Sequence, residues 1–119
     1  MAAAAVLQID YSPSLLSLRR SILERAGYGV ISLLGTADAL APSLRRQSIA
    51  VIVIGHGASW YDRQAMISHF CDSLPDVPII SLLRKRDLGF NGADFNCPGD
   101  NPPLWLRTVA QALPSTPAK

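Results

Sequence analysis

The apolar residues of this chain fall into short runs, and the most continuous of them lies in the middle of the sequence. Ile49–Ile54 is apolar at every position and rich in β-branched residues. A run without polar alternation is typical of a strand buried on both faces of a parallel sheet. Gly55–Gly57 then turns the chain, and Ser59 with Asp62 has the spacing of a capping box. We therefore expect a central strand followed by a helix, its carboxyl end at the edge where α/β sheets bind ligands.

Four further apolar segments are typical of strands: Val6–Ile9, Val30–Leu34, Val77–Leu82 and Asp94–Cys97. Segments with helical spacing alternate with them. In the first, Ser12 and Pro13 predict a helix start and Gly27 predicts its end. The apolar positions that we expect to form its buried face are Leu15, Leu18, Ile22 and Ala26.

Three more helices are expected along the chain. One runs from Thr36 to Arg46, where Pro42 predicts a kink or a late start. The helix after Ser59 has an inner face of Ile67, Phe70 and Leu74. The last helix starts at Asn101–Pro103 and carries a stripe of Leu106, Val109, Ala110 and Leu113.

Strands that alternate with helices predict a parallel sheet with helices on both faces. Of the doubly wound orders, 2-1-3-4-5 suits five strands in this length, so we expect a three-layer, flavodoxin-like α/β fold. That order brings the ends of the first and third strands together, which makes Asp10 and Gly55–Gly57 neighbours. We expect one domain over residues 1–114 and a frayed tail over 115–119.

Composition excludes several classes of protein. The 119 residues are 49% hydrophobic and 17% charged, which describes an ordered globular chain. The net charge of +2 is too small to indicate a partner. The basic residues fall on separate expected elements without interleaved aromatic residues, so we expect no binding to nucleic acid.

Three sequence features bear on the cellular location: signal peptides, membrane-spanning runs and disulfide frameworks. Met1–Val6 is apolar but has no basic region before it, so it does not resemble a signal peptide. No apolar run approaches the roughly 20 residues that cross a bilayer. Cys71 and Cys97 make no disulfide framework. We expect free thiols, a cytoplasmic location and no membrane association.

Five short motifs, in this order and spacing, resemble the receiver domain of bacterial two-component response regulators. They are V-L-Q-I-D-Y-S-P at 6–13, A-G-Y-G-V at 26–30, the strand that ends before Gly55, V-P-I-I-S-L-L at 77–83, and Gly-Ala at 92–93 followed by Cys-Pro at 97–98. The resemblance covers nearly the whole chain. It implies the fold derived above and a role in signal transduction or a phosphorelay.

The resemblance also shows which site residues are missing. The family begins its site with an acidic pair that holds Mg²⁺; Asp10 matches the first member, but Tyr11 stands at the second. The phosphoryl-accepting aspartate corresponds to Gly55, which offers no nucleophile. Tyrosine at neutral pH is a protonated phenol and a poor ligand for Mg²⁺.

Two further family positions differ. The Ser or Thr at the end of the fourth strand corresponds to Leu83, with Ser81 two residues earlier. The lysine before the proline that follows the fifth strand corresponds to Cys97. Phosphoryl transfer needs the carboxylate, a divalent cation and a stabilising positive charge. The chain therefore resembles a pseudo-receiver. We expect no enzymatic activity, no metal and no cofactor, and a function carried by protein–protein contact.

The segment R-K-R-D-L-G-F-N between Leu83 and Gly92 is too short for the helix that receivers have there. We expect that helix to be reduced or missing, which leaves part of the sheet uncovered. Leu88 and Phe90 can cover only some of it, and the basic rim is Arg84, Lys85 and Arg86. Such a patch predicts a partner surface for an acidic protein or for a second copy in a homodimer.

A second hypothesis belongs to another class: a small enzyme or ligand-binding domain that uses His56 and Asp10. This hypothesis needs a concave pocket with polar groups above Gly55. If the protein is an interaction module instead, His56 is a loop residue without a chemical role. Asp10 then accepts hydrogen bonds from His56 or from the Gly55–Gly57 backbone. Cys97 is either redox-active or a buried thiol. Trp60 and Trp105 either contact a partner or pack against loops.

Overall fold

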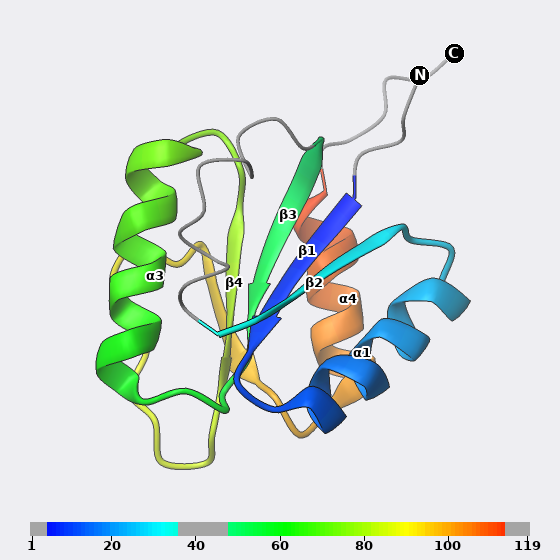
Figure 1. The fold of residues 1–119 in the computed structure, drawn as a ribbon, viewed down its shortest axis with the longest axis horizontal. Coiled ribbons are helices and arrows are strands. Elements are labelled where there is room, and N and C mark those ends of the chain that lie inside the picture. Colours follow the sequence, from blue (N-terminus) through cyan, green and yellow to red (C-terminus); the bar gives the residue numbers. More distant parts are fainter. Residues whose placement is uncertain (1–4, 36–47, 114–119) are drawn as a thin grey trace.

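The computed structural model describes residues 5–35 and 48–113 (Figure 1). The helix expected from Thr36 to Arg46 and the tail expected at 115–119 lie outside the described residues. The described elements follow in the order β1, α1, β2, β3, α3, β4, β5, α4.

Five parallel strands form one sheet: β1 (Ala5–Asp10), β2 (Val30–Leu34), β3 (Ile49–Ile54), β4 (Ile79–Leu83) and β5 (Phe95–Pro98). Their order across the sheet is β2-β1-β3-β4-β5, so β3 is central and β1 lies beside it. The predicted fold class and strand order are confirmed. The fifth strand is displaced by one residue from the predicted range.

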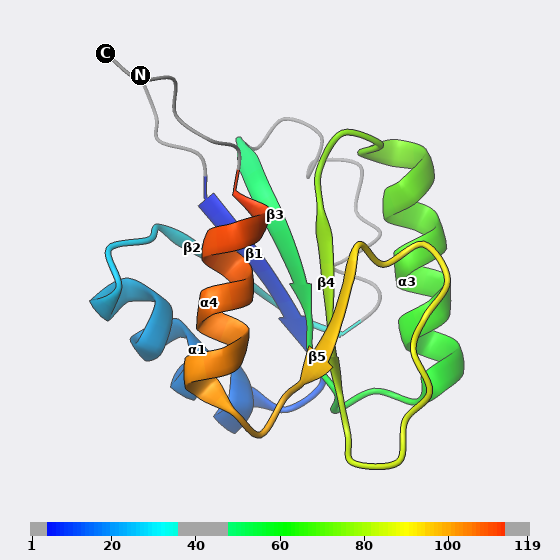
Figure 2. The same ribbon diagram turned by 180° about the vertical axis from the view of Figure 1, so that it is seen from behind.

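Three described helices cover the sheet: α1 (Pro13–Arg25), α3 (Trp60–Ser73) and α4 (Pro102–Ala112). α3 lies on one face and α1 with α4 on the other (Figures 1 and 2). Each helix begins where the sequence places a cap, because the side chains of Ser12, Ser59 and Asn101 accept backbone N–H groups of the first turn. In the described part of the chain, no helix is long and apolar enough to span a bilayer.

The strands contribute to two cores, one on each face. On the α3 face, Leu7, Ile9, Ile52 and Ile54 pack with Met66, Ile67 and Phe70. On the other face, Val6, Val51, Val53 and Ile80 pack with Leu23, Trp105 and Val109. Successive residues of one strand point to opposite faces, so an unbroken apolar run fills both cores.

The buried faces of two helices differ from the prediction. α1 turns Leu16, Arg19 and Leu23 inward, whereas Leu18 is 55% exposed. α4 buries Trp105, which is 1% exposed, while Ala110 faces outward. The expected face was therefore offset on α1. On α4 the prediction was wrong only at Ala110, because Val109 is buried and Leu106 and Leu113 pack against the core as expected. The α3 face was predicted correctly at Ile67 and Phe70.

No helix lies between β4 and β5 in the described structure, as predicted from the length of that segment. The chain turns at 84–87 and then runs along α3 toward β5 (Figure 2). Nε2 of Gln64 donates to the carbonyl of Asn91 at 3.0 Å, which fixes the segment to α3. Phe90 is 4% exposed and belongs to the α3-side core. Phe90 covers part of the sheet, as expected, but its place among the residues of the partner surface was wrong, because its ring is buried in the core.

Candidate functional site

Asp10 ends β1 and is buried at the carboxyl edge of the sheet. Its Oδ1 accepts hydrogen bonds from the backbone N–H groups of Tyr11 at 2.7 Å and Ser12 at 3.2 Å. Its Oδ2 accepts a hydrogen bond from Nη1 of Arg19 at 2.6 Å. Donors from the chain itself therefore occupy both oxygens of this carboxylate.

Arg19 reaches Asp10 from the buried face of α1. The side chains of the pair are 3% and 0% exposed, so the two charges are removed from water. Nη2 of Arg19 is also buried and has no hydrogen-bond partner among the described residues. Removing one partner of such a pair leaves an uncompensated buried charge, which is strongly destabilising.

Gly55 allows this ion pair to lie against the end of β3. A Cβ added at Gly55 would overlap the carboxylate of Asp10 and the guanidinium of Arg19, and one at Gly57 would overlap the carboxylate. Neither glycine has a positive φ. The close approach of the two side chains, rather than backbone geometry, therefore requires a residue without a Cβ here.

His56 follows Gly55, and its imidazole is half-buried. The ring lies against the backbone after β5, because a Cβ added at Gly99 would contact it. Burial, followed by the positive charge of Arg19, lowers the pKa of His56 below its usual 6.5, and the Asp10 carboxylate opposes this shift in part. The imidazole is therefore neutral at pH 7.

The expectation that Asp10 accepts hydrogen bonds from His56 or from the Gly55–Gly57 backbone was wrong. The buried guanidinium of Arg19 and the backbone of the next turn take those positions instead. The structure does bring Asp10 next to Gly55 and Gly57, as the strand order predicts.

The remaining expected positions lie along β4 and β5. Ser81 pairs with Ile54 across the sheet, and its hydroxyl is buried without a partner among the described residues. Leu83 ends β4 and is partly exposed. Cys97 is buried in β5; burial raises the pKa of its thiol, and a hydrogen bond with Thr108 opposes that shift in part. The thiol is therefore protonated at neutral pH, and Cys97 is a buried thiol rather than a reactive one.

A second buried arginine, Arg63 of α3, holds the segment between β4 and β5. Its Nη1 donates to Oδ2 of Asp87 at 2.8 Å, and its guanidinium lies 4.9 Å from the centre of the Phe90 ring. The same Asp87 oxygen accepts the backbone N–H of Arg84 at 2.7 Å. The hydrogen bond from Arg63 lowers the pKa of Asp87. Asp87 therefore joins α3 to the turn that replaces the missing helix.

Sequence reasoning missed the roles of both buried arginines. The available signal was helical spacing: Arg19 is three residues after Leu16 and four before Leu23. Arg63 is likewise four residues before Ile67. A basic residue at such a position lies on the inner face of its helix and needs a buried acidic partner.

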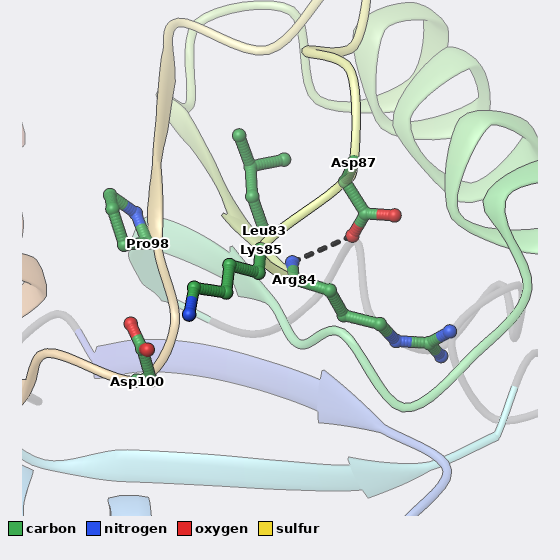
Figure 3. Close-up of a pocket in the computed structure, with 6 residues that line it drawn as sticks. All are labelled: Leu83, Arg84, Lys85, Asp87, Pro98 and Asp100. Atoms are coloured by element: carbon green, nitrogen blue, oxygen red, sulfur yellow. Dashed lines mark hydrogen bonds between the residues drawn. The ribbon is translucent and has the colours of Figure 1, made fainter.

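A cavity of about 300 Å³ lies between the ends of β4 and β5 (Figure 3). Leu83 and Pro98 supply its apolar part, and Lys85, Arg84, Asp87 and Asp100 line it. The Arg84 guanidinium points away from the cavity and donates to the carbonyls of His56 at 2.7 Å and Ala58 at 3.1 Å. This cavity is at the β4–β5 end of the sheet, whereas the volume beside Gly55 is filled by the ion pair.

The residues expected at a partner surface separate into two groups. Phe90 is buried, and Arg84 is tied to the β3–α3 loop. Leu88 is 78% exposed, and Lys85 and Arg86 are exposed beside it in the sequence. Two exposed aromatic residues at the start of α3, Trp60 and Tyr61, lie close to this segment, because Trp60 stacks on Phe90.

No protein-family model matches this sequence, and no curated protein is significantly similar to it. Solved structures do match over almost the whole chain. Chemotaxis protein CheY4 of Vibrio cholerae aligns with a TM-score of 0.77 at 22% identity, covering 94% of this chain and 100% of that one. A response regulator receiver domain from Clostridium thermocellum aligns with a TM-score of 0.81 at 18% identity, covering 92% and 94%. The response regulator TrrA of Thermotoga maritima, solved with Mg²⁺ and BeF, aligns with a TM-score of 0.78 at 16% identity, covering 93% and 100%.

The described elements define an α/β protein with a doubly wound parallel sheet. More narrowly, the chain has the CheY-like fold of response regulator receiver domains, as the sequence resemblance predicts.

The residues at the edge of this sheet do not fit an Mg²⁺ site of the receiver kind. Both oxygens of Asp10 already accept hydrogen bonds, and one of them faces a guanidinium. A second cation there would meet the positive charge of Arg19 instead of additional oxygen ligands. Among the described residues, no group of three His, Cys, Asp or Glu side chains is placed to hold a metal.

Proposed function

We propose that the protein is a cytoplasmic receiver-like signalling domain that works by protein–protein contact, independently of phosphorylation. One observation carries this proposal: the buried ion pair of Asp10 and Arg19 fills the space beside Gly55. In the receiver domains that this chain resembles, that space holds the phosphoryl-accepting carboxylate and its metal. An internal guanidinium therefore supplies the positive charge there, and the domain keeps one state without a phosphoryl group.

The same packing favours an interaction module over the small enzyme or ligand-binding domain. A catalytic or ligand site needs room for a reacting group near His56 and Asp10. The carboxylate of Asp10 has its oxygens occupied, and the neutral imidazole of His56 forms no hydrogen bond with it in the described structure. A general base would lack the acidic group that orients its ring.

The proposal is tested by treating the domain with acetyl phosphate or phosphoramidate in the presence of Mg²⁺. Intact-mass spectrometry should show no phosphoryl adduct, while a phosphorylatable receiver in the same reaction should be labelled. An adduct on the domain would contradict the proposal. If that adduct mapped to His56, the enzyme or ligand-binding hypothesis would replace it.

A second experiment tests whether the domain binds a partner independently of phosphorylation. Affinity capture from the source cell should recover the same protein whether or not the domain has been exposed to a phosphoryl donor. A partner that binds only after such treatment would show that phosphorylation matters after all.

A further inference from the structure

β2 forms one edge of the sheet, and no other described strand covers that edge. It pairs with β1 alone, whereas β1, β3 and β4 each lie between two strands (Figure 1). No residue of β2 is fully buried, although all but Ser32 are apolar. Natural edge strands are usually protected from pairing with another chain by a charged residue, a proline or a bulge. β2 has none of these three features.

The opposite edge of the sheet, β5, is protected. It has four residues and ends at Pro98, which has no N–H to donate. The segment before it also packs against the strand, because Oδ1 of Asn96 accepts the backbone N–H of Phe90 at 2.9 Å. The two edges therefore differ, and β2 is the edge that can pair with a further strand.

The outward hydrogen-bonding groups of β2 belong to alternate residues. The backbone N–H of Val6 donates to the carbonyl of Gly29 at 2.9 Å, so Gly29 faces β1. In a parallel ladder every second residue bonds to the same neighbour. Val30, Ser32 and Leu34 therefore direct their N–H and C=O groups away from the sheet. No described residue forms a hydrogen bond with these outward groups.

The sequence of this edge matches itself when it is reversed. Residues 29–35 are G-V-I-S-L-L-G, which is glycine, two apolar residues, serine, two apolar residues and glycine in either direction. In an antiparallel pairing of two copies centred on Ser32, Val30 of one copy lies opposite Leu34 of the other. Both members of that pair are apolar, and the stretch holds no charged residue that could oppose its own copy.

We propose that β2 pairs antiparallel with β2 of a second copy of this chain, about a two-fold axis at Ser32, so that the two sheets become one. Each pair of outward residues exchanges two N–H···O bonds in this arrangement. Leu34, which is 49% exposed, is covered on the α1 side. On the α3 side, Ile31 of one copy lies opposite Leu33 of the other, and both already pack against the core there. This surface is an addition to the proposed function and does not depend on it.

A second copy fits this edge better than an unrelated strand does, because a two-fold interface requires a surface that complements itself. The self-matching order of 29–35 meets that requirement. The pairing is short, at five residues a strand. We therefore expect a weak dimer, with a dissociation constant of about 10 to 300 µM.

Analytical ultracentrifugation of the unmodified domain measures this association. From roughly 10 µM to 1 mM, the domain should change from monomer to dimer. Leu34→Lys places a charge on the edge and should weaken the dimer about tenfold or more. Leu88→Lys is the matched control: Leu88 is 78% exposed in the segment between β4 and β5, and this variant should dimerise like the unmodified domain. Circular dichroism checks that both variants are folded.

Amide hydrogen exchange followed by NMR identifies the strand that pairs. The amides of Val30, Ser32 and Leu34 should exchange quickly in dilute samples and about tenfold or more slowly at 1 mM. Those of Ile31 and Leu33 bond to β1 and should be protected at both concentrations. In a mixture of labelled and unlabelled copies, an intermolecular contact between the Hα atoms of Ile31 and Leu33 is expected, since these residues form a non-hydrogen-bonded antiparallel pair.

Three results would overturn the proposal. A monomer at every concentration up to 1 mM would exclude the dimer, and association unchanged in Leu34→Lys would place the contact elsewhere. If the three outward amides became protected only when another protein was added, the edge would belong to a strand of that protein. A phosphoryl adduct in the earlier test would instead contradict the proposed function and leave these results unaffected.

Discussion

The absence of a side chain at Gly55 is a packing requirement. Gly55→Ala should destabilise the domain by about 1 to 3 kcal/mol, because the new Cβ must displace Asp10 and Arg19. Gly29→Ala is the matched control, since the nearest atom to its added Cβ is 4.0 Å away, and it should change stability little. Urea unfolding measures both variants. Equal stability of the two would show that the ion pair moves aside at no cost.

We expect Asp10 to contribute more to the free energy of unfolding than an exposed hydrogen-bond acceptor would. Asp10→Asn leaves the guanidinium of Arg19 buried without a counter-charge, so we expect a loss of about 3 to 5 kcal/mol in unfolding free energy. Asp10→Asn combined with Arg19→Met removes both charges and should recover much of that loss. Glu24→Gln, which breaks the exposed pair with Arg20, should cost less than about 1 kcal/mol. A double variant no more stable than Asp10→Asn would contradict this account.

The lowered pKa of His56 predicts a pH dependence of stability. The unfolded chain protonates this residue near its usual 6.5, whereas the folded domain does so only at lower pH. The unfolded state therefore binds more protons in that interval, and stability falls as pH drops from about 7.5 to about 5.5.

Urea midpoints across that pH range test this dependence. His56→Gln should flatten the decline, while His69→Gln retains His56 and should retain the decline. An identical decline in His56→Gln would assign it to other groups.

Individual residues also show where sequence reasoning reached its limit. The sequence identified Asp10 and Gly55, and showed that Tyr11 and Gly55 replace family carboxylates, because these positions lie at strand ends that the apolar runs mark clearly. Arg19 was not identified as a buried partner, since a basic residue on an amphipathic helix is usually solvated. Its burial follows from which face α1 turns to the sheet, and that face is chosen by packing with β1 and β2 rather than by the helix alone.

At the scale of elements, the segment between β4 and β5 is held mainly by Phe90. Phe90→Ala removes a ring from the core beside Trp60 and Arg63, so we expect a loss of about 3 to 5 kcal/mol. Leu88→Ala, two residues earlier and exposed, should fall within about 0.5 kcal/mol of the unmodified domain. Urea unfolding followed by circular dichroism measures the pair. Similar stabilities of the two variants would place Phe90 outside the core.

The same segment shows why elements are easier to predict than their contacts. Its length alone excluded a standard crossover helix, and the caps Ser12 and Ser59 marked helix starts correctly. Nothing in the sequence of residues 84–91 distinguishes Leu88 from Phe90 as the buried residue. The choice depends on Arg63 and Trp60, which approach from α3 far away in the sequence.

The whole molecule should unfold as one unit, because its two cores share the same strands. Ile52 and Ile54 belong to the core under α3, while Val51 and Val53, between and beside them on β3, belong to the core under α1 and α4. Loss of either core removes packing that holds β3 in the sheet. The other core then loses the strand against which it packs. The unfolding transition should therefore be two-state.

The two tryptophans allow this prediction to be measured on each face separately. Trp60 lies at the α3 side and is partly exposed, whereas Trp105 is buried in the opposite core. In Trp60→Phe, fluorescence reports on Trp105 alone, and its urea transition should coincide with that of far-ultraviolet circular dichroism. The unmodified domain, in which both tryptophans contribute, should likewise show coincident transitions. A Trp105 transition that clearly precedes or follows the loss of secondary structure would show that the α1–α4 side and the α3 side of the sheet unfold independently.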